Sequence, residues 1–79
     1  MTPKQRAILM ALAAAHTLGG TLTIDQLIAA AKLSASKQAA QQTLRTLERR
    51  GLLERFYERR MERVHLVLRP TLRGLERVS

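Results

Sequence analysis

Apolar residues recur every three or four positions along the first 50 residues of this chain and at every second position after Gly51. The first spacing is typical of helices with one buried face, and the second is typical of strands. The pattern therefore predicts an α+β protein in which three helices precede two strands.

The first predicted helix begins at Pro3, with Thr2 as its N-cap and Gln5 completing a capping box. The Gly19–Gly20 pair ends it, because glycine adopts the positive φ angles of a helix end. The apolar run at residues 7–15 follows two basic residues and also resembles a secretory signal peptide. We favour the helix, since a signal peptide has no need of a cap. The run is too short to span a bilayer, which takes about 20 apolar residues.

The second predicted helix follows a short strand at residues 21–22. Thr23 and Gln26 form another capping box. The helix has one apolar face, formed by Ile24, Leu27, Ile28 and Ala31, and is expected to end near Lys32 or Leu33. The turn to the next helix therefore lies close after these residues.

The third predicted helix runs from a cap at Ser36 to residue 50 and stops at Gly51. Its buried face consists of Ala40, Leu44 and Leu47. Two basic residues at its end suit the negative end of the helix dipole.

Residues 52–58 and 63–69 each alternate with period two, and a polar turn at residues 59–62 joins them. Adjacent strands with a short connection predict an antiparallel hairpin. Pro70 ends the second strand because it cannot donate a backbone hydrogen bond. Thr71 then caps a last short helix over residues 72–78.

The composition of the chain limits the kinds of partner that it can bind. Fourteen Lys and Arg against six Asp and Glu give a net charge of +8 in 79 residues, which favours polyanions. This length predicts a single domain over residues 1–79. The absence of Cys excludes disulfides and thiolate metal sites. Two aromatic residues, Phe56 and Tyr57, are too few for a platform that stacks single-stranded nucleic acid.

A known family shares several of these positions. They are Ser36, Ala40, Leu44, Leu47, Glu48, Gly51, Leu52 and Leu53, followed after the hairpin by Thr71 and Gly74. In these residues the chain resembles the MarR-like winged helix-turn-helix regulators over nearly its whole length. Two departures are Pro70, where the family usually has Leu, and the family's long C-terminal dimerisation helix, which has no counterpart in these 79 residues.

The resemblance implies a winged helix: a three-helix bundle with a helix-turn-helix and a C-terminal β-hairpin wing. It also implies DNA binding. The family's mode of dimerisation is not carried over, because it depends on the long helix.

The outward face of the third helix independently suits a DNA major groove, where Gln pairs with adenine and Lys or Arg with guanine. No acid occurs from residue 34 to residue 46, whereas solvated helices usually mix both charges. We expect helix 36–50 to lie in the major groove of double-stranded DNA and to contact it through Ser36, Lys37, Gln38, Gln41, Gln42, Arg45 and Arg49. The alternative is that this helix face is only exposed to solvent and binds no DNA. For Ser36 the alternative is that it caps the helix and makes no contact with DNA.

In the wing, residues 53–69, we expect Arg55, Arg59, Arg60 and Arg63 to contact DNA. Arginine on a hairpin suits phosphate contact or insertion into a minor groove. Because Glu58 and Glu62 can pair with these arginines, a solubilising hairpin that protects the sheet edges with charge is the alternative.

The first helix is apolar on more than one face. With Ile8, Leu9 and Leu12 turned to the core, a second set remains uncovered: Ala7, Met10, Ala14 and Leu18. Exposed apolar stripes often mark interfaces, so we expect a homodimer through this helix. The alternative is that these side chains simply lie exposed.

Catalysis finds no support in the sequence. His16 and His65 fall on different elements, Asp25 is the only Asp, and no metal-ligand spacing or phosphate-binding glycine motif occurs. We therefore expect a small cytoplasmic transcription regulator, a repressor that occupies an operator, with no cofactor, metal or membrane association. The sequence supports no inference about a small-molecule ligand. A winged-helix module that binds another protein and a nonspecific architectural DNA-binding protein are the alternatives.

Overall fold

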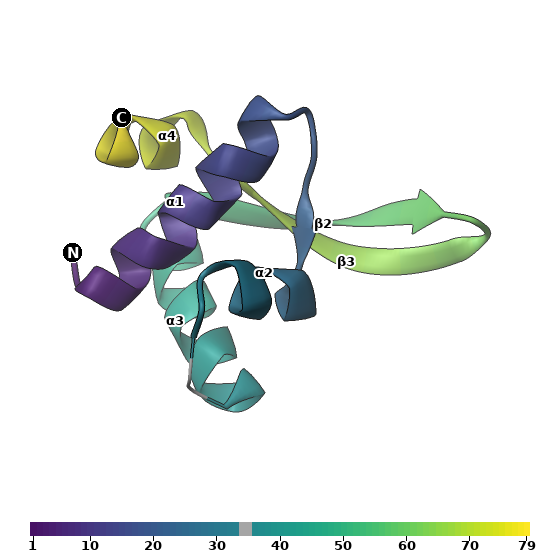
Figure 1. Cartoon of the computed structure of the whole chain (residues 1–79), viewed down its shortest axis with the longest axis horizontal. Helices are drawn as coiled ribbons and strands as arrows, with labels where there is room; N and C mark the ends of the chain where they lie inside the picture. Colours follow the sequence, from purple (N-terminus) through teal and green to yellow (C-terminus); the bar gives the residue numbers. More distant parts are fainter. Residues whose placement is uncertain (34–35) are drawn as a thin grey trace.

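The computed structural model describes residues 1–33 and 36–79. In chain order its elements are α1 (Pro3–Thr17), β1 (Leu22–Thr23), α2 (Ile24–Ala30), α3 (Lys37–Arg49), β2 (Leu53–Arg60), β3 (Arg63–Pro70) and α4 (Leu72–Val78). The predicted order of three helices, a hairpin and a last short helix is confirmed (Figure 1).

Each helix begins at a side-chain cap, as the sequence predicts. The hydroxyl groups of Thr2 and Thr23 accept hydrogen bonds from the backbone N–H groups of Gln5 and Gln26, and both capping boxes are complete. Ser36 and Thr71 cap α3 and α4 in the same way. These caps fix where the helices start, because they satisfy backbone donors that have no partner within the helix.

The first three helices end in one type of turn, in which the residue after the C-cap adopts a left-handed conformation. That residue is Gly19 after α1 (φ +79°) and Gly51 after α3 (φ +74°), but it is Lys32 after α2 (φ +54°). The backbone N–H groups of Lys32 and Leu33 donate to carbonyls in the last turn of α2. The expected end of α2 near residue 32 or 33 is therefore wrong, since Lys32 already lies in the turn.

The three strands form one antiparallel sheet in the order β1-β3-β2. β1 begins one residue later than predicted and pairs with β3 only at Leu68 and Val67. β2 and β3 both run longer than predicted, and only Met61 and Glu62 form the turn between them. Both of these residues have positive φ, which is the backbone of a tight two-residue hairpin. Beyond β1 the hairpin projects from the body as a two-stranded ribbon (Figure 1).

The core lies between the helices and the inner half of the sheet. Its buried side chains are Ile8, Leu9 and Leu12 of α1, Leu27 of α2, Leu44 and Leu47 of α3, and Leu52, Leu53 and Leu68 of the hairpin region. The predicted inward residues of α1 and α3 are therefore confirmed. α1 contacts α2, α4 and β3 and so holds the two ends of the chain to one body.

The helix α4 is docked on the turn that ends α3. The Thr71 hydroxyl donates to the Gly51 carbonyl at 2.6 Å, and the Thr71 N–H donates to the Leu52 carbonyl at 3.2 Å. Gly74 is buried against this turn. The Thr-x-x-Gly pattern therefore has a structural reason, and Pro70 precedes it without disturbing the helix start.

Candidate nucleic-acid interface

The face of α3 opposite the core presents one continuous polar stripe. Gln38, Gln42, Arg45 and Arg49 follow one another at spacings of four, three and four residues, and all four are exposed. We call this set the outer stripe. The spacing places the four side chains along one line of the helix surface, where a groove of a duplex can meet them together.

The other predicted residues of α3 flank this stripe. Gln41 is half-buried beside it. Lys37 is exposed at the start of the helix, where its ammonium lies 3.3 Å from the Asp25 carboxylate. Exposed ion pairs of this kind contribute little free energy, so the Lys37 charge stays available to a ligand. Ser36 caps the helix through its Oγ, which accepts from the Ala39 N–H at 3.2 Å.

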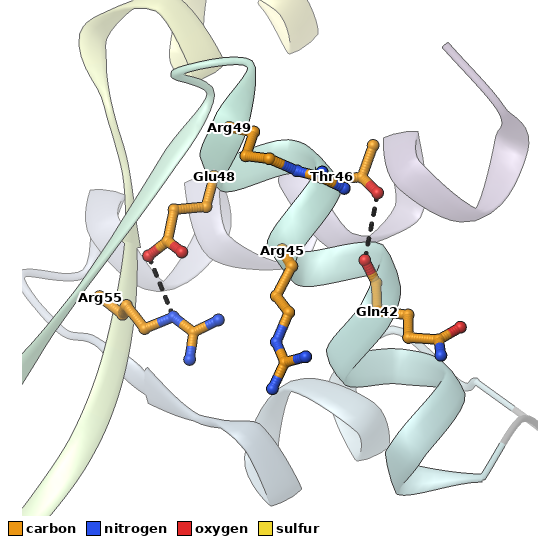
Figure 2. Close-up of a pocket in the computed structure, with 6 residues that line it drawn as sticks. All are labelled: Gln42, Arg45, Thr46, Glu48, Arg49 and Arg55. Atoms are coloured by element: carbon orange, nitrogen blue, oxygen red, sulfur yellow. Dashed lines mark hydrogen bonds and ion pairs between the residues drawn. The ribbon is translucent and has the colours of Figure 1, made fainter.

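Glu48, the one acidic residue of α3, is held by an arginine of the hairpin. The Arg55 Nε donates to Glu48 Oε2 at 3.0 Å, and both side chains are partly buried. Figure 2 shows Arg45 and Arg55 extending to the same side of α3. They line an open hollow together with Gln42, Thr46, Glu48 and Arg49. The pair thus neutralises the acid and joins the base of the hairpin to the end of the outer stripe.

The register of the hairpin divides its arginines between two faces. Arg55 and Arg59 share a face with Leu53 and Leu68, because directly paired strand residues point to the same side. Leu53 and Leu68 pack in the core with α3, so this is the α3 face of the hairpin. Arg60 lies on the opposite face because successive strand residues alternate, and the register places its partner Arg63 there too.

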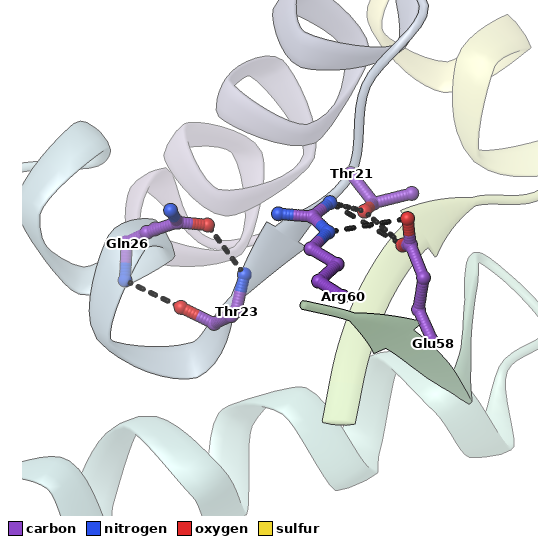
Figure 3. A network of polar contacts seen from close by, with 5 residues as sticks. All are labelled: Thr21, Thr23, Gln26, Glu58 and Arg60. Carbon is purple, nitrogen blue, oxygen red and sulfur yellow. Dashed lines mark hydrogen bonds and ion pairs between the residues drawn. The ribbon is translucent and has the colours of Figure 1, made fainter. Parts of the chain in front are cut away.

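Arg60 belongs to a polar network that ties the hairpin to the chain just before β1. Its Nη2 donates to the Thr21 hydroxyl at 2.9 Å and its Nε donates to Glu58 at 3.2 Å, while Thr21 also donates to Glu58 at 3.0 Å (Figure 3). The hydrogen bonds from Arg60 and then Thr21 lower the pKa of the Glu58 carboxyl below its ordinary value of 4.5. The network therefore anchors the outer half of β2.

Two arginines remain near the tip of the hairpin. Arg59 and Arg63 are exposed, and neither forms an ion pair with another residue in the part of the chain that the structure describes. Glu62 lies in the turn and is likewise exposed. Of the four predicted arginines of the hairpin, these two are the least constrained by internal contacts.

The sequence prediction did not include the exposed apolar residues of the hairpin. Tyr57 is 74% exposed, Val64 is 60% exposed and Met61 is 97% exposed. Tyr57 and Val64 both lie on the α3 face. The strict alternation along the strands was the available signal, but it does not show where the hairpin leaves the body and exposes both of its sides.

The predicted second face of α1 is largely exposed. Met10 is 52% exposed, Leu18 is 88% exposed and Ala14 is also exposed, whereas Ala7 is half-buried. His16 lies exposed near the end of the same helix, and His65 is half-buried on β3. Three of the four residues therefore form an uncovered stripe in the single chain.

Residues 1–33 and 36–79 contain no group of three or more His, Asp or Glu side chains arranged to hold a metal ion. None of the described helices has the length and the apolar character needed to cross a bilayer.

A helix-turn-helix formed by α2 and α3, followed by the β2–β3 hairpin, defines a winged-helix protein, and the hairpin is its wing. A model of the MarR family matches residues 1–60. The chain therefore belongs to the MarR family.

Solved structures agree with this assignment. The Staphylococcus aureus MepR–DNA complex matches with a TM-score of 0.83 and 24% identity over 99% of this chain and 59% of the MepR chain. A structure of MepR described as a transcription regulator of the multidrug efflux pump MepA gives a TM-score of 0.79 with 24% identity over 99% of this chain and 53% of that one. A ZitR variant from Lactococcus lactis gives 0.75 with 26% identity over 99% and 48%. This chain thus spans 48% to 59% of the length of these proteins. No curated protein matches it.

Proposed function

We propose that this protein binds double-stranded DNA at specific sequences and acts as a transcriptional repressor by occupying its operator. The outer stripe of α3 carries the proposal, because four exposed Gln and Arg side chains line one helix face whose nearby acid is already paired with Arg55. Glutamine and arginine are the side chains that read adenine and guanine in a major groove. That the structurally similar MepR has been solved with DNA supports the same ligand here.

In this proposal α3 lies in the major groove. Gln38, Gln42, Arg45 and Arg49 contact base edges, while residues at the helix start and flank contact the sugar-phosphate backbone. The latter set consists of Ser36, Lys37 and Gln41.

The wing contacts the backbone or an adjacent minor groove. Arg59 and Arg63 are the principal contacts because they are exposed and unpaired among the described residues. Arg55 acts from the base of the wing beside Arg45. Arg60 contributes chiefly by holding the wing through Thr21 and Glu58.

The first experiment is the selection and sequencing of bound duplexes from a random library at about physiological salt. We expect one sequence motif to be enriched. The Kd for duplexes that carry this motif should be about 10⁻⁸ M or lower, as is typical of specific protein–DNA complexes. Binding without enrichment would leave a nonspecific architectural role, and no binding would leave a protein partner.

Two variants then test the contribution of α3. Arg45→Ala is expected to weaken binding to the selected site by about tenfold or more, since a bidentate arginine contact is worth about 1–3 kcal/mol. Arg77→Ala, which removes an exposed charge of the same kind from α4, is the matched control and should leave binding nearly unchanged. Equal losses in both variants would indicate a general charge effect instead of base recognition.

A second proposal concerns assembly. We propose that the stripe of Ala7, Met10, Ala14 and Leu18 on α1 joins two copies of the chain, so that two α3 helices address two half-sites. Light scattering should then give a dimer at tens of micromolar, and Leu18→Lys should give a monomer. Met61→Lys, at an equally exposed apolar residue of the wing turn, should leave the dimer intact. A monomeric parent protein would exclude this proposal without affecting DNA binding by α3.

A further inference from the structure

An exposed aromatic side chain stands between two arginines on the α3 face of the wing. Tyr57 is 74% exposed, and Arg55 and Arg59 lie two residues before and after it on β2. Residues at this spacing point to the same side of a strand and are about 6.6 to 6.8 Å apart. Val64, 60% exposed, pairs with Arg59 across the hairpin and faces the same way.

At Arg55 this side of the wing adjoins the outer stripe of α3. Arg55 is bonded to Glu48 at the end of α3, and Arg45 and Arg55 line one hollow. For a ligand that contacts Arg45 and Arg55 and extends along β2 toward the turn, Tyr57 is the next exposed side chain on that side of the strand. An apolar protein surface is a poor match there, because Arg59 beside the ring is exposed and has no ion-pair partner among the described residues.

We propose that Tyr57 is a DNA-contacting residue of the wing, with its ring packed on the deoxyribose of the duplex that α3 contacts and its hydroxyl donating to a phosphate. Val64 extends the apolar contact beside it. This inference rests on the proposed function. It adds that the wing binds DNA partly through an uncharged contact. The affinity that this contact contributes does not depend on counterion release.

The inference is tested by measuring the equilibrium binding of variants to the selected duplex at salt concentrations between 50 and 200 mM. Tyr57→Ala is expected to lower the affinity by about fivefold or more at every salt concentration and to leave the slope of log K against log salt unchanged. Arg59→Ala is expected to reduce the magnitude of that slope by about 0.9, because one phosphate contact is lost. Tyr57→Phe separates the hydroxyl from the ring and should fall between the parent protein and Tyr57→Ala.

Leu72→Ala provides the matched control, since Leu72 of α4 has the same exposed fraction of 74%. It should bind DNA as the parent protein does. If the parent protein binds DNA and Tyr57→Ala binds equally well, the Tyr57 contact is refuted while the proposed function stands. If the parent protein binds no duplex at any salt concentration, both are refuted.

Discussion

Gly74 lies so close to Leu52 that a Cβ atom at Gly74 would stand 1.9 Å from the Leu52 carbonyl oxygen. The same carbonyl accepts the hydrogen bond from the Thr71 N–H. A glycine at this position thus lets the first turn of α4 rest directly on the backbone that follows α3.

We predict that Gly74→Ala lowers the free energy of unfolding by about 2 kcal/mol or more, because backbone atoms have little freedom to relieve such an overlap. Urea denaturation measures the loss. Gly20→Ala is the control, since its nearest neighbour is the Ala15 carbonyl oxygen at 3.5 Å. A small effect at Gly74 would mean that α4 shifts away from Leu52 at little cost.

Lys32 occupies the left-handed position that ends α2, where glycine is the usual residue. Lys32→Gly is predicted to raise the free energy of unfolding by up to about 1 kcal/mol, since it removes the steric cost of the Cβ atom. Thermal and urea unfolding measure the gain. Lys32→Ala removes the same charge but keeps the Cβ atom, and it should give no gain. Equal gains would point to charge instead of backbone conformation.

Thr21 anchors the wing through Glu58 and Arg60. Replacement by Val keeps the shape of the side chain and removes both hydrogen bonds. We predict amide hydrogen exchange about thirtyfold faster in the outer hairpin, because each of the two bonds contributes about 1 kcal/mol. Thr17→Val removes a hydroxyl that bonds only within α1 and should leave this exchange unchanged. An unaltered rate in Thr21→Val would show that strand pairing alone holds the wing.

The same network predicts a pH dependence of stability. Because the bonds from Arg60 and Thr21 depress the pKa of Glu58 in the folded protein, the ionised carboxylate stabilises the fold at pH values above its ordinary pKa of 4.5. This contribution is lost as the pH falls through the lower, folded-state pKa. Unfolding of the parent protein and of Glu58→Gln should therefore differ most near neutral pH and converge in acid. A difference that stays constant with pH would contradict the assignment.

The helix starts were predictable because local side chains determine them. Thr2, Thr23 and Ser36 bond to backbone groups three residues away, so a short stretch of sequence holds all the necessary information. The ends at Gly19 and Gly51 carried an equally local signal. The end of α2 carried none, because tertiary structure there places a lysine in a conformation that lysine seldom adopts.

The candidate site was predictable in composition but not in arrangement. Helical periodicity correctly separates the buried face of α3 from its polar face. The face on which Arg63 lies depends on the register of β2 against β3 and on a two-residue turn formed by Met61 and Glu62. Neither residue favours positive φ, so the four-residue turn expected from polarity alone is wrong. The roles of Arg55 and Arg60 follow from contacts with Glu48 on α3 and with Thr21 just before β1, which are distant from the wing in the sequence.

Because β1 pairs with only a short part of β3, the wing can become longer or shorter, in evolution or by design, without a change in that pairing. β1 covers β3 only at Val67 and Leu68, so the outer pairs of the hairpin, up to the turn at Met61 and Glu62, have no third strand beside them. Adding two residues to each strand next to the turn would keep every existing side chain on its present face and extend the reach of the wing by about 6.6 to 6.8 Å. If the wing contacts DNA as proposed, the span of duplex that such a protein covers can thus be altered while its helical body stays the same.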